Sequence, residues 1–246
     1  MKLGVELCHS NGIDTILFDL DGTLRENNPS FNDAMMGFAL QLGLTGESEN
    51  RRQAHRWLHY YWAQSPELVS DLDTYEDYSE EFWTNHARLY LQAFGCQSEQ
   101  ASDLAPELTR CMVEEYDPED GLVDEAPHLL GSLKEAGFRL AVVSNRRNPF
   151  DEQLESLGIH AYFEYTLAAG SINAYKPDPA VFHHALNEMG IEPDQGIYVG
   201  DNYFADVIGA QKARMQAVLI DPEGLFPEAE CPIIDGLDEL QMVLRD

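Results

Sequence analysis

Short runs of consecutive apolar residues are the feature that most restricts how this chain can fold. Half-exposed strands alternate apolar and polar residues, whereas these runs are continuous and are separated by helical patterns. They read TILFD (15–19), RLAVVS (139–144), GIYVG (196–200) and AVLID (217–221), and a fifth candidate is YFEYTLA (162–168). Continuous runs of this length are typical of parallel strands buried on both faces. The chain is therefore predicted to have an α/β fold with a doubly wound, mainly parallel sheet.

Helical patterns occupy the segments between these predicted strands. Residues 126–137 place apolar side chains at helical spacing and end in Gly137, a residue type that often terminates helices. Residues 178–190 have a proline in the predicted first turn and a glycine after the last. A third pattern covers residues 204–214. Helices would thus cover both faces of the sheet, as in a Rossmann-like core.

Residues 28–118 break this alternation. They contain long amphipathic patterns and no convincing strand: NDAMMGFALQLG, RRQAHRWLHYYWAQ, YSEEFWTNHARLYLQAFG and ASDLAPELTRCMVEEY. The pattern predicts an α-helical insertion between the first strand and the rest of the sheet. We therefore expect two modules, an α/β core formed by residues 1–27 and 119–246 and a helical module formed by residues 28–118.

The net charge argues against several classes of partner. It is −29, from 44 acidic and 15 basic residues, so the surface repels nucleic acids and anionic membranes. No apolar run approaches the roughly 20 residues of a membrane span, and the N-terminal stretch is a poor signal peptide. The four cysteines, Cys8, Cys96, Cys111 and Cys231, fit no zinc-binding spacing and are interpreted as reduced thiols. We expect a cytoplasmic protein whose partner is a small molecule.

Polar residues follow each predicted strand at its carboxyl end, where open α/β sheets bind ligands. In chain order they are Asp19 and Asp21, Ser144 and Asn145, Lys176, and Asp201 with Asp206. Three or four clustered carboxylates require a cation, and an all-oxygen donor set suits magnesium better than zinc. A lysine beside them can neutralise a substrate phosphate. Carboxylates, magnesium and lysine together indicate phosphoryl transfer.

Four motifs carry a resemblance to a known family. DLDGTL, VVSN, KPDP and GDNYFAD, in this order at strand ends, resemble the four motifs of the haloacid dehalogenase (HAD) superfamily. The helical insertion after the first motif is similar to the helical cap of that family. The resemblance covers the whole predicted core and implies a HAD-like hydrolase.

The resemblance also implies catalytic roles for four residues. Asp19 would be the nucleophile that forms an aspartyl-phosphate. Asp21 would be the general acid that protonates the leaving oxygen and then the base that activates water. Ser144 would hydrogen-bond a phosphoryl oxygen, and Lys176 would hold both Asp19 and the phosphoryl group by charge.

Further positions would bind substrate or metal. Thr23 and Asn145 would support the phosphate-binding loops, and Arg25 is a candidate for lining the pocket. The resemblance implies the cofactor Mg²⁺, bound by Asp19, the backbone carbonyl of Asp21, and Asp201, with Asp206 in an outer shell or bound through water.

An aspartate at position 21 separates reaction types, because the dehalogenases of the superfamily need no acid at that place. The sequence therefore favours a magnesium-dependent phosphatase acting on a small phosphorylated metabolite. A phosphomutase of the same superfamily, a 2-haloacid dehalogenase and a non-catalytic binding protein are the alternatives. Sugar phosphates, nucleoside monophosphates, phosphoglycolate and other organic acids all remain open as substrates.

Overall fold

A computed structural model of the protein describes residues 12–45 and 47–244. Cys8 and most of the N-terminal stretch, which was judged above to be a poor signal peptide, lie outside the described residues. The chain divides into two compact units, which we call the core unit (Met1–Glu26 and Gly121–Asp246) and the helical unit (Asn27–Asp120). Of the helices in the described ranges, none is long and apolar enough to cross a bilayer.

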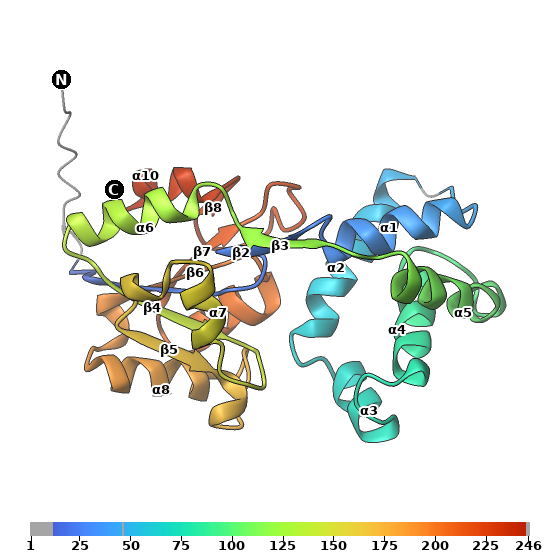
Figure 1. Ribbon diagram of the computed structural model, residues 1–246, viewed down its shortest axis with the longest axis horizontal. Coiled ribbons are helices and arrows are strands. Elements are labelled where there is room, and N and C mark those ends of the chain that lie inside the picture. The colour runs from blue at the N-terminus through green and yellow to red at the C-terminus, as the bar shows by residue number, and fades with distance from the viewer. Residues whose placement is uncertain (1–11, 46, 245–246) are drawn as a thin grey trace. The chain divides into compact units, whose positions relative to one another are not determined.

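The core unit contains a six-stranded parallel sheet with the strand order β5-β4-β1-β6-β7-β8 (Figure 1). Its strands are β1 (Thr15–Phe18), β4 (Arg139–Ser144), β5 (Tyr165–Ala168), β6 (Gly196–Gly200), β7 (Gln216–Ile220) and β8 (Ile233–Ile234). The five predicted strands are all present, and the predicted α/β fold is confirmed. Strand β8 was not predicted, because a strand of two residues leaves no periodic pattern.

The register of the central strands determines which residues meet at the functional edge. Phe18, the last residue of β1, lies opposite Val142 of β4 and Val199 of β6. Because all three strands run in the same direction, the residues that follow them emerge at one edge of the sheet. The sheet therefore brings together polar residues that lie far apart in the sequence.

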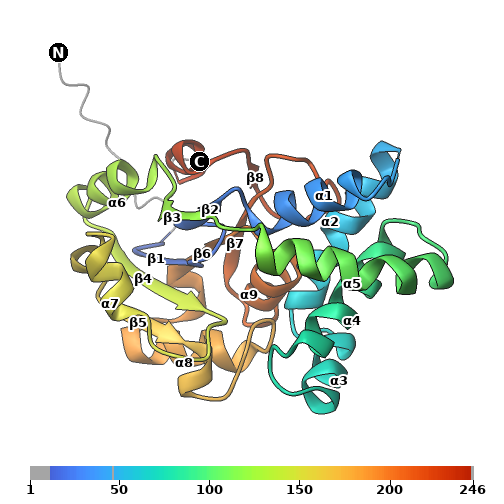
Figure 2. The same cartoon turned by 45° about the vertical axis from the view of Figure 1, so that its right-hand side comes forward.

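Helices cover both faces of this sheet (Figure 2). Alternate residues of a strand point to opposite faces, so Ile16 and Phe18 pack on one side and Leu17 on the other. The first face is covered by α6 (Ala126–Glu135), α7 (Asp151–Ser156) and α10 (Leu240–Val243), and the second by α8 (Pro179–Met189) and α9 (Ile208–Lys212).

Short helical turns connect several of these elements. They are the 3₁₀ turns His160–Tyr162, Ala169–Ser171, Pro193–Gln195 and Leu237–Glu239, and the π-helical turn η4 (Tyr203–Val207). The helix predicted over residues 204–214 is therefore divided into η4 and α9. π-helical turns often occur at functional sites, and η4 carries Asp206.

The helical unit contains α1 (Phe31–Gln41), α2 (Ser48–Trp62), α3 (Pro66–Thr74), α4 (Glu80–Ala93) and α5 (Ser98–Glu114). Serine side chains at 30, 65 and 79 accept hydrogen bonds from the first turns of α1, α3 and α4. Helix α3 was not predicted, although the pair Ser65-Pro66 is a typical helix start. The thiols of Cys96, Cys111 and Cys231 are free.

The chain passes between the two units through β2 (Arg25–Asn28) and β3 (Glu119–Leu122), which pair in a separate two-stranded sheet. Neither strand was predicted. Their sequences, RENN and EDGL, contain no β-branched or aromatic residue, so they lack the composition typical of strands.

Candidate active site

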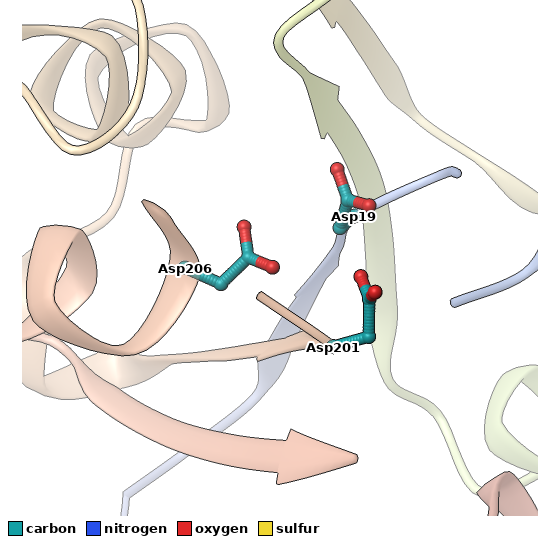
Figure 3. A group of neighbouring side chains, drawn as sticks. All are labelled: Asp19, Asp201 and Asp206. Atoms are coloured by element: carbon teal, nitrogen blue, oxygen red, sulfur yellow. The ribbon is translucent and has the colours of Figure 1, made fainter. Parts of the chain in front are cut away.

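Three aspartates of the core unit converge beyond the carboxyl ends of β1 and β6. Asp19 follows β1, and its backbone N–H donates to the carbonyl of Val199 at 2.9 Å. Asp201 directly follows β6, and Asp206 lies in η4. One carboxylate oxygen from each residue lies within 4.8 Å of the others, and Figure 3 shows the three side chains pointing toward a common region. Among the described residues, these three aspartates form the group of acidic side chains that could hold a metal ion.

Two glycines make this convergence possible. Gly22 has a φ of 87°, and a Cβ there would lie 2.5 Å from Oδ2 of Asp201. Any other residue at position 22 would therefore be strained and would collide with that carboxylate. At Gly200 a Cβ would overlap the carboxylate of Asp206. Gly22 and Gly200 thus leave space for the carboxylates of Asp201 and Asp206.

Lys176 lies at the centre of the cluster. Its Nζ donates to Oδ1 of Asp19 and to Oδ1 of Asp206, each at 2.6 Å, and to the hydroxyl of Tyr198 at 2.9 Å. The ammonium group has three protons, and these three acceptors match them. Lys176 is only 2% exposed, so its charge is balanced by neighbours and not by water.

The electrostatics of the cluster favour a cation. Burial raises the pKa of Asp19 to about 7, although the positive charge of Lys176 acts to lower it. Burial, and to a lesser extent repulsion from Asp19, raises the pKa of Asp201 to about 7. Burial also raises the pKa of Asp206. Burial alone would lower the pKa of Lys176, but Asp19 and Asp206 raise it well above its usual value. A single lysine therefore does not compensate the carboxylates fully.

Asn145 holds the backbone of Lys176 in place. Its side-chain N–H donates to the carbonyl of Lys176 at 2.9 Å, and its side-chain oxygen accepts from the N–H of Lys176 at 2.7 Å. Ser144 is buried at the end of β4, the strand beside β1. The hydroxyl of Thr23 is 3.4 Å from Oδ1 of Asp201. These three residues therefore lie at the same sheet edge as the acids.

The side chain of Asp21 is oriented differently. It is not part of the three-carboxylate group. Its Oδ2 accepts from Nε of Arg146 at 2.7 Å, and its Oδ1 accepts from Nη2 of Arg146 at 2.7 Å and from Nη1 of Arg25 at 3.0 Å. Arg25, expected to line a pocket, forms an ion pair with Asp21.

Tyr198 and Arg146 were not predicted as site residues. Tyr198 lies inside the apolar run GIYVG, where a buried tyrosine looks like core; its hydroxyl donates to the carbonyl of Val143 at 2.7 Å. Arg146 directly follows VVSN, and a charged residue so close to a predicted site was the available signal.

The donor set fits a hard divalent cation. Mg²⁺ prefers carboxylate, carbonyl and water oxygens, and Asp19 and Asp201 supply carboxylates. Both oxygens of Asp206 have protein partners, Lys176 for Oδ1 and the N–H of Asn202 for Oδ2 at 2.9 Å. Asp206 is thus better placed to hold Lys176 and Asn202 than to bind a metal directly.

Comparisons with known proteins identify the family of the chain. A family model for haloacid dehalogenase-like hydrolases matches residues 13–214. Haloacid dehalogenase-like hydrolase domain-containing protein 3 of Homo sapiens is 29% identical over 227 residues, covering 90% of this chain and 87% of that protein. The Bos taurus protein of the same name is 35% identical over 107 residues, so the match spans 43% of each chain.

Solved structures share the fold. The structure of a predicted phosphoglycolate phosphatase from Haemophilus somnus has a TM-score of 0.57 at 22% identity, covering 95% of this chain and 99% of that one. The 2-haloacid dehalogenase from Pseudomonas syringae has a TM-score of 0.52 at 24% identity, covering 94% and 98%. With the family model matching most of its length, the chain belongs to the haloacid dehalogenase-like hydrolases.

Proposed function

We propose that the protein is a magnesium-dependent phosphatase that hydrolyses the monoester of a small phosphorylated metabolite. The observation that carries this proposal is the buried ammonium group of Lys176 held between Asp19 and Asp206, with Asp201 beside them. Such a centre can neutralise and position a phosphoryl group, which is most of what phosphoryl transfer requires.

The chain would hold the metal through the carboxylates of Asp19 and Asp201 and the backbone carbonyl of Asp21. Asp206 would act from an outer position, because both of its oxygens already accept hydrogen bonds. Bound Mg²⁺ would neutralise charge on the phosphoryl oxygens. The raised pKa values of Asp19 and Asp201 support this assignment, since a divalent cation would stabilise both ionised carboxylates.

The chemistry would proceed in two steps. A carboxylate oxygen of Asp19 forms a bond to phosphorus while the bond from phosphorus to the leaving oxygen breaks, and Asp21 gives that oxygen a proton. Asp21 then takes a proton from water, whose oxygen attacks phosphorus and releases Asp19. Lys176 and Ser144 hold the phosphoryl oxygens throughout, with Thr23 and Asn145 supporting the loops.

Named relatives support a phosphatase. The glyceraldehyde 3-phosphate phosphatase of Methanopyrus kandleri is 29% identical over 219 residues, covering 85% of this chain and 84% of that protein. The phosphoserine phosphatase of Thermus thermophilus is 35% identical over 128 residues, about half of each chain. Asp21 also favours a phosphatase over a dehalogenase, which needs no acid to release a halide. We keep residues 28–118 as the proposed cap that sets specificity.

Replacing the nucleophile tests the proposal. In Asp19→Asn, phosphate release from p-nitrophenyl phosphate should fall on the order of 10³-fold or more, because the amide is a poor nucleophile. Asp194→Asn is the matched control, since Asp194 is exposed in the turn Pro193–Gln195. Turnover by Asp19→Asn at the parental rate would contradict the mechanism.

A panel of phosphorylated metabolites would then identify the substrate class. Free phosphate should appear with the dephosphorylated metabolite as the other product. An isomerised phosphate ester without free phosphate would instead indicate a phosphomutase, and chloride release from a 2-haloacid would indicate a dehalogenase.

A further inference from the structure

Arg146 is held rigidly beside the motif that carries the proposed acid and base. Its Nη1 donates to the side-chain oxygen of Gln153 on α7, and its guanidinium carbon lies 5.7 Å from the ring centre of Phe150. Its two remaining donor groups, Nε and Nη2, both bind Asp21. The guanidinium is therefore restrained on several sides, and the edge formed by Nε and Nη2 is the one that meets the carboxylate.

The contact between Arg146 and Asp21 is bidentate. Two parallel hydrogen bonds of 2.7 Å join the guanidinium edge to the two carboxylate oxygens. Such a pair restricts the direction of a carboxylate more tightly than a single charge contact does. Arg25 adds a third hydrogen bond of 3.0 Å to Oδ1, so the carboxylate cannot rotate without breaking at least one of them.

This restraint matters because Asp21 is not held by burial. Its side chain is 39% exposed, whereas Asp19 and Asp206 are buried and bound to Lys176. A half-exposed aspartate samples several side-chain rotamers unless it is held. A general acid must meet the leaving oxygen within hydrogen-bonding distance, and a displacement of about 1 Å can cost about 10²-fold in rate.

We propose that Arg146 is a positioning residue that acts on the reaction through Asp21. Its planar guanidinium fixes the direction of the Asp21 carboxyl group, which donates a proton as the acid in the first step and accepts one as the carboxylate in the second. The inference rests on the acid and base role proposed above for Asp21. It assigns Arg146 no contact with the substrate.

A double-mutant cycle tests this coupling. We expect Arg146→Gln to lower kcat about 10- to 100-fold with a much smaller change in KM. In an Asp21→Asn background the same replacement should have almost no further effect, because the group through which Arg146 acts is already lost. Equal fold-losses in both backgrounds would overturn the inference.

The leaving group supplies a second readout that a purely structural role would not change. p-Nitrophenolate leaves without protonation, whereas an alkoxide needs an acid. In Arg146→Gln the loss of kcat should therefore be larger for the best alkyl phosphate of the metabolite panel than for p-nitrophenyl phosphate. A loss expressed mainly in KM, and only for substrates with a second anionic group, would show instead that Arg146 binds substrate directly and would overturn the inference.

Two further variants separate geometry from charge and from folding. Arg146→Lys keeps the charge but loses the planar fork, so it should remain nearly as impaired as Arg146→Gln; full activity in this variant would contradict the proposal. Arg139→Gln is the matched control, because Arg139 lies at the other end of β4 in a surface ion pair with Glu164. Its kcat should equal that of the parent.

The same cycle distinguishes failure of this inference from failure of the proposed function. If Asp21→Asn hydrolyses alkyl phosphates at the parental rate, the acid and base role of Asp21 is wrong. If Asp21→Asn is impaired and Arg146→Gln is not, only the role of Arg146 is wrong.

Discussion

Lys176 and His86 are both buried basic side chains, one in each unit, with opposite surroundings. Lys176 of the core unit is 2% exposed, and each proton of its ammonium group has an acceptor. His86 of the helical unit is 1% exposed, and its Nε2 has no hydrogen-bond partner in the described part of the chain. Burial alone disfavours the charged form of either base.

The neighbouring side chains determine whether each of these two buried bases is charged. The carboxylates of Asp19 and Asp206 raise the pKa of Lys176 well above its usual value although burial lowers it. Aromatic rings surround His86, with ring centres between 4.8 and 5.9 Å away: Phe31, Trp57, Tyr61, Trp62 and Trp83. They offer no counter-charge, and burial lowers the pKa of His86 to about 3. Lys176 therefore stays charged because acids lie beside it, whereas His86 has no acid beside its ring among the described residues and packs as a neutral imidazole.

The largest effect should come from removing the charge in the core unit. Lys176→Met leaves the carboxylates of Asp19 and Asp206 without a counter-ion, and it should abolish phosphate release. Removing one partner of a buried ion pair costs about 3–5 kcal/mol in the free energy of unfolding. Urea denaturation and a phosphate-release assay measure both effects.

Lys212→Met is the control for this change, because Lys212 is an exposed lysine of α9 in the same unit. It should retain the parental stability and turnover. A Lys176→Met variant as stable as the parent would mean that the ammonium group does not hold the two acids together.

His86→Phe should produce a smaller, pH-dependent effect. Because the pKa of His86 is near 3 in the folded protein and about 6.5 in the unfolded chain, acid favours unfolding below pH 6.5. One such group costs about 2 kcal/mol of stability between pH 7.5 and pH 5. The variant should lose this part of the pH dependence.

Tryptophan fluorescence during urea denaturation would report this transition, because all three tryptophans, at positions 57, 62 and 83, lie around His86. His128→Phe, at an exposed position of α6, is the control. An unchanged pH dependence in His86→Phe would show that the buried imidazole does not resist protonation.

Magnesium should change the thermal stability least, and its stabilising effect should grow as the pH rises. Asp19 and Asp201 have pKa values of about 7, above the value near 4 of an unfolded aspartate, so without metal their contribution to stability falls as pH rises from about 4 to about 7. Mg²⁺ binds the ionised carboxylates and competes with these protons. At ten times its dissociation constant it would add about 1.4 kcal/mol.

The shift in Tm between Mg²⁺ and EDTA should therefore be at least twice as large at pH 8 as at pH 5.5. Asp201→Asn should lose most of this shift. A shift of equal size at both pH values would contradict the assignment of the raised pKa values to the metal-binding carboxylates.

Regular patterns made much of the fold predictable. The runs that became β1, β4, β5, β6 and β7 are apolar and continuous because the sheet is covered on both faces. Helix α8 was recognisable from Pro179 and Gly190 at its two ends, and Gly190 has the left-handed conformation expected there. The strands β2, β3 and β8 were missed because they are short, and two of them are polar.

The proposed site was partly predictable for the same reason. Once the strands are known to be parallel, the residues after them must share an edge, and this places Asp19, Ser144 and Asp201 together. The partners of individual side chains were not predictable. Tyr198 looks like one more apolar position, yet its hydroxyl accepts a hydrogen bond from Lys176.

The sequence by itself determined the order of the five longer strands of the sheet, the family, and which acids follow the strand ends, because these follow from local periodicity and from motifs of a few residues. Only the tertiary structure decided the pairing of charges: Lys176 with Asp19 and Asp206, and Asp21 with Arg146, which is 125 residues away in the chain. The physical reason is that the strength of an ion pair depends on distance and burial. Those quantities exist only after the chain has folded.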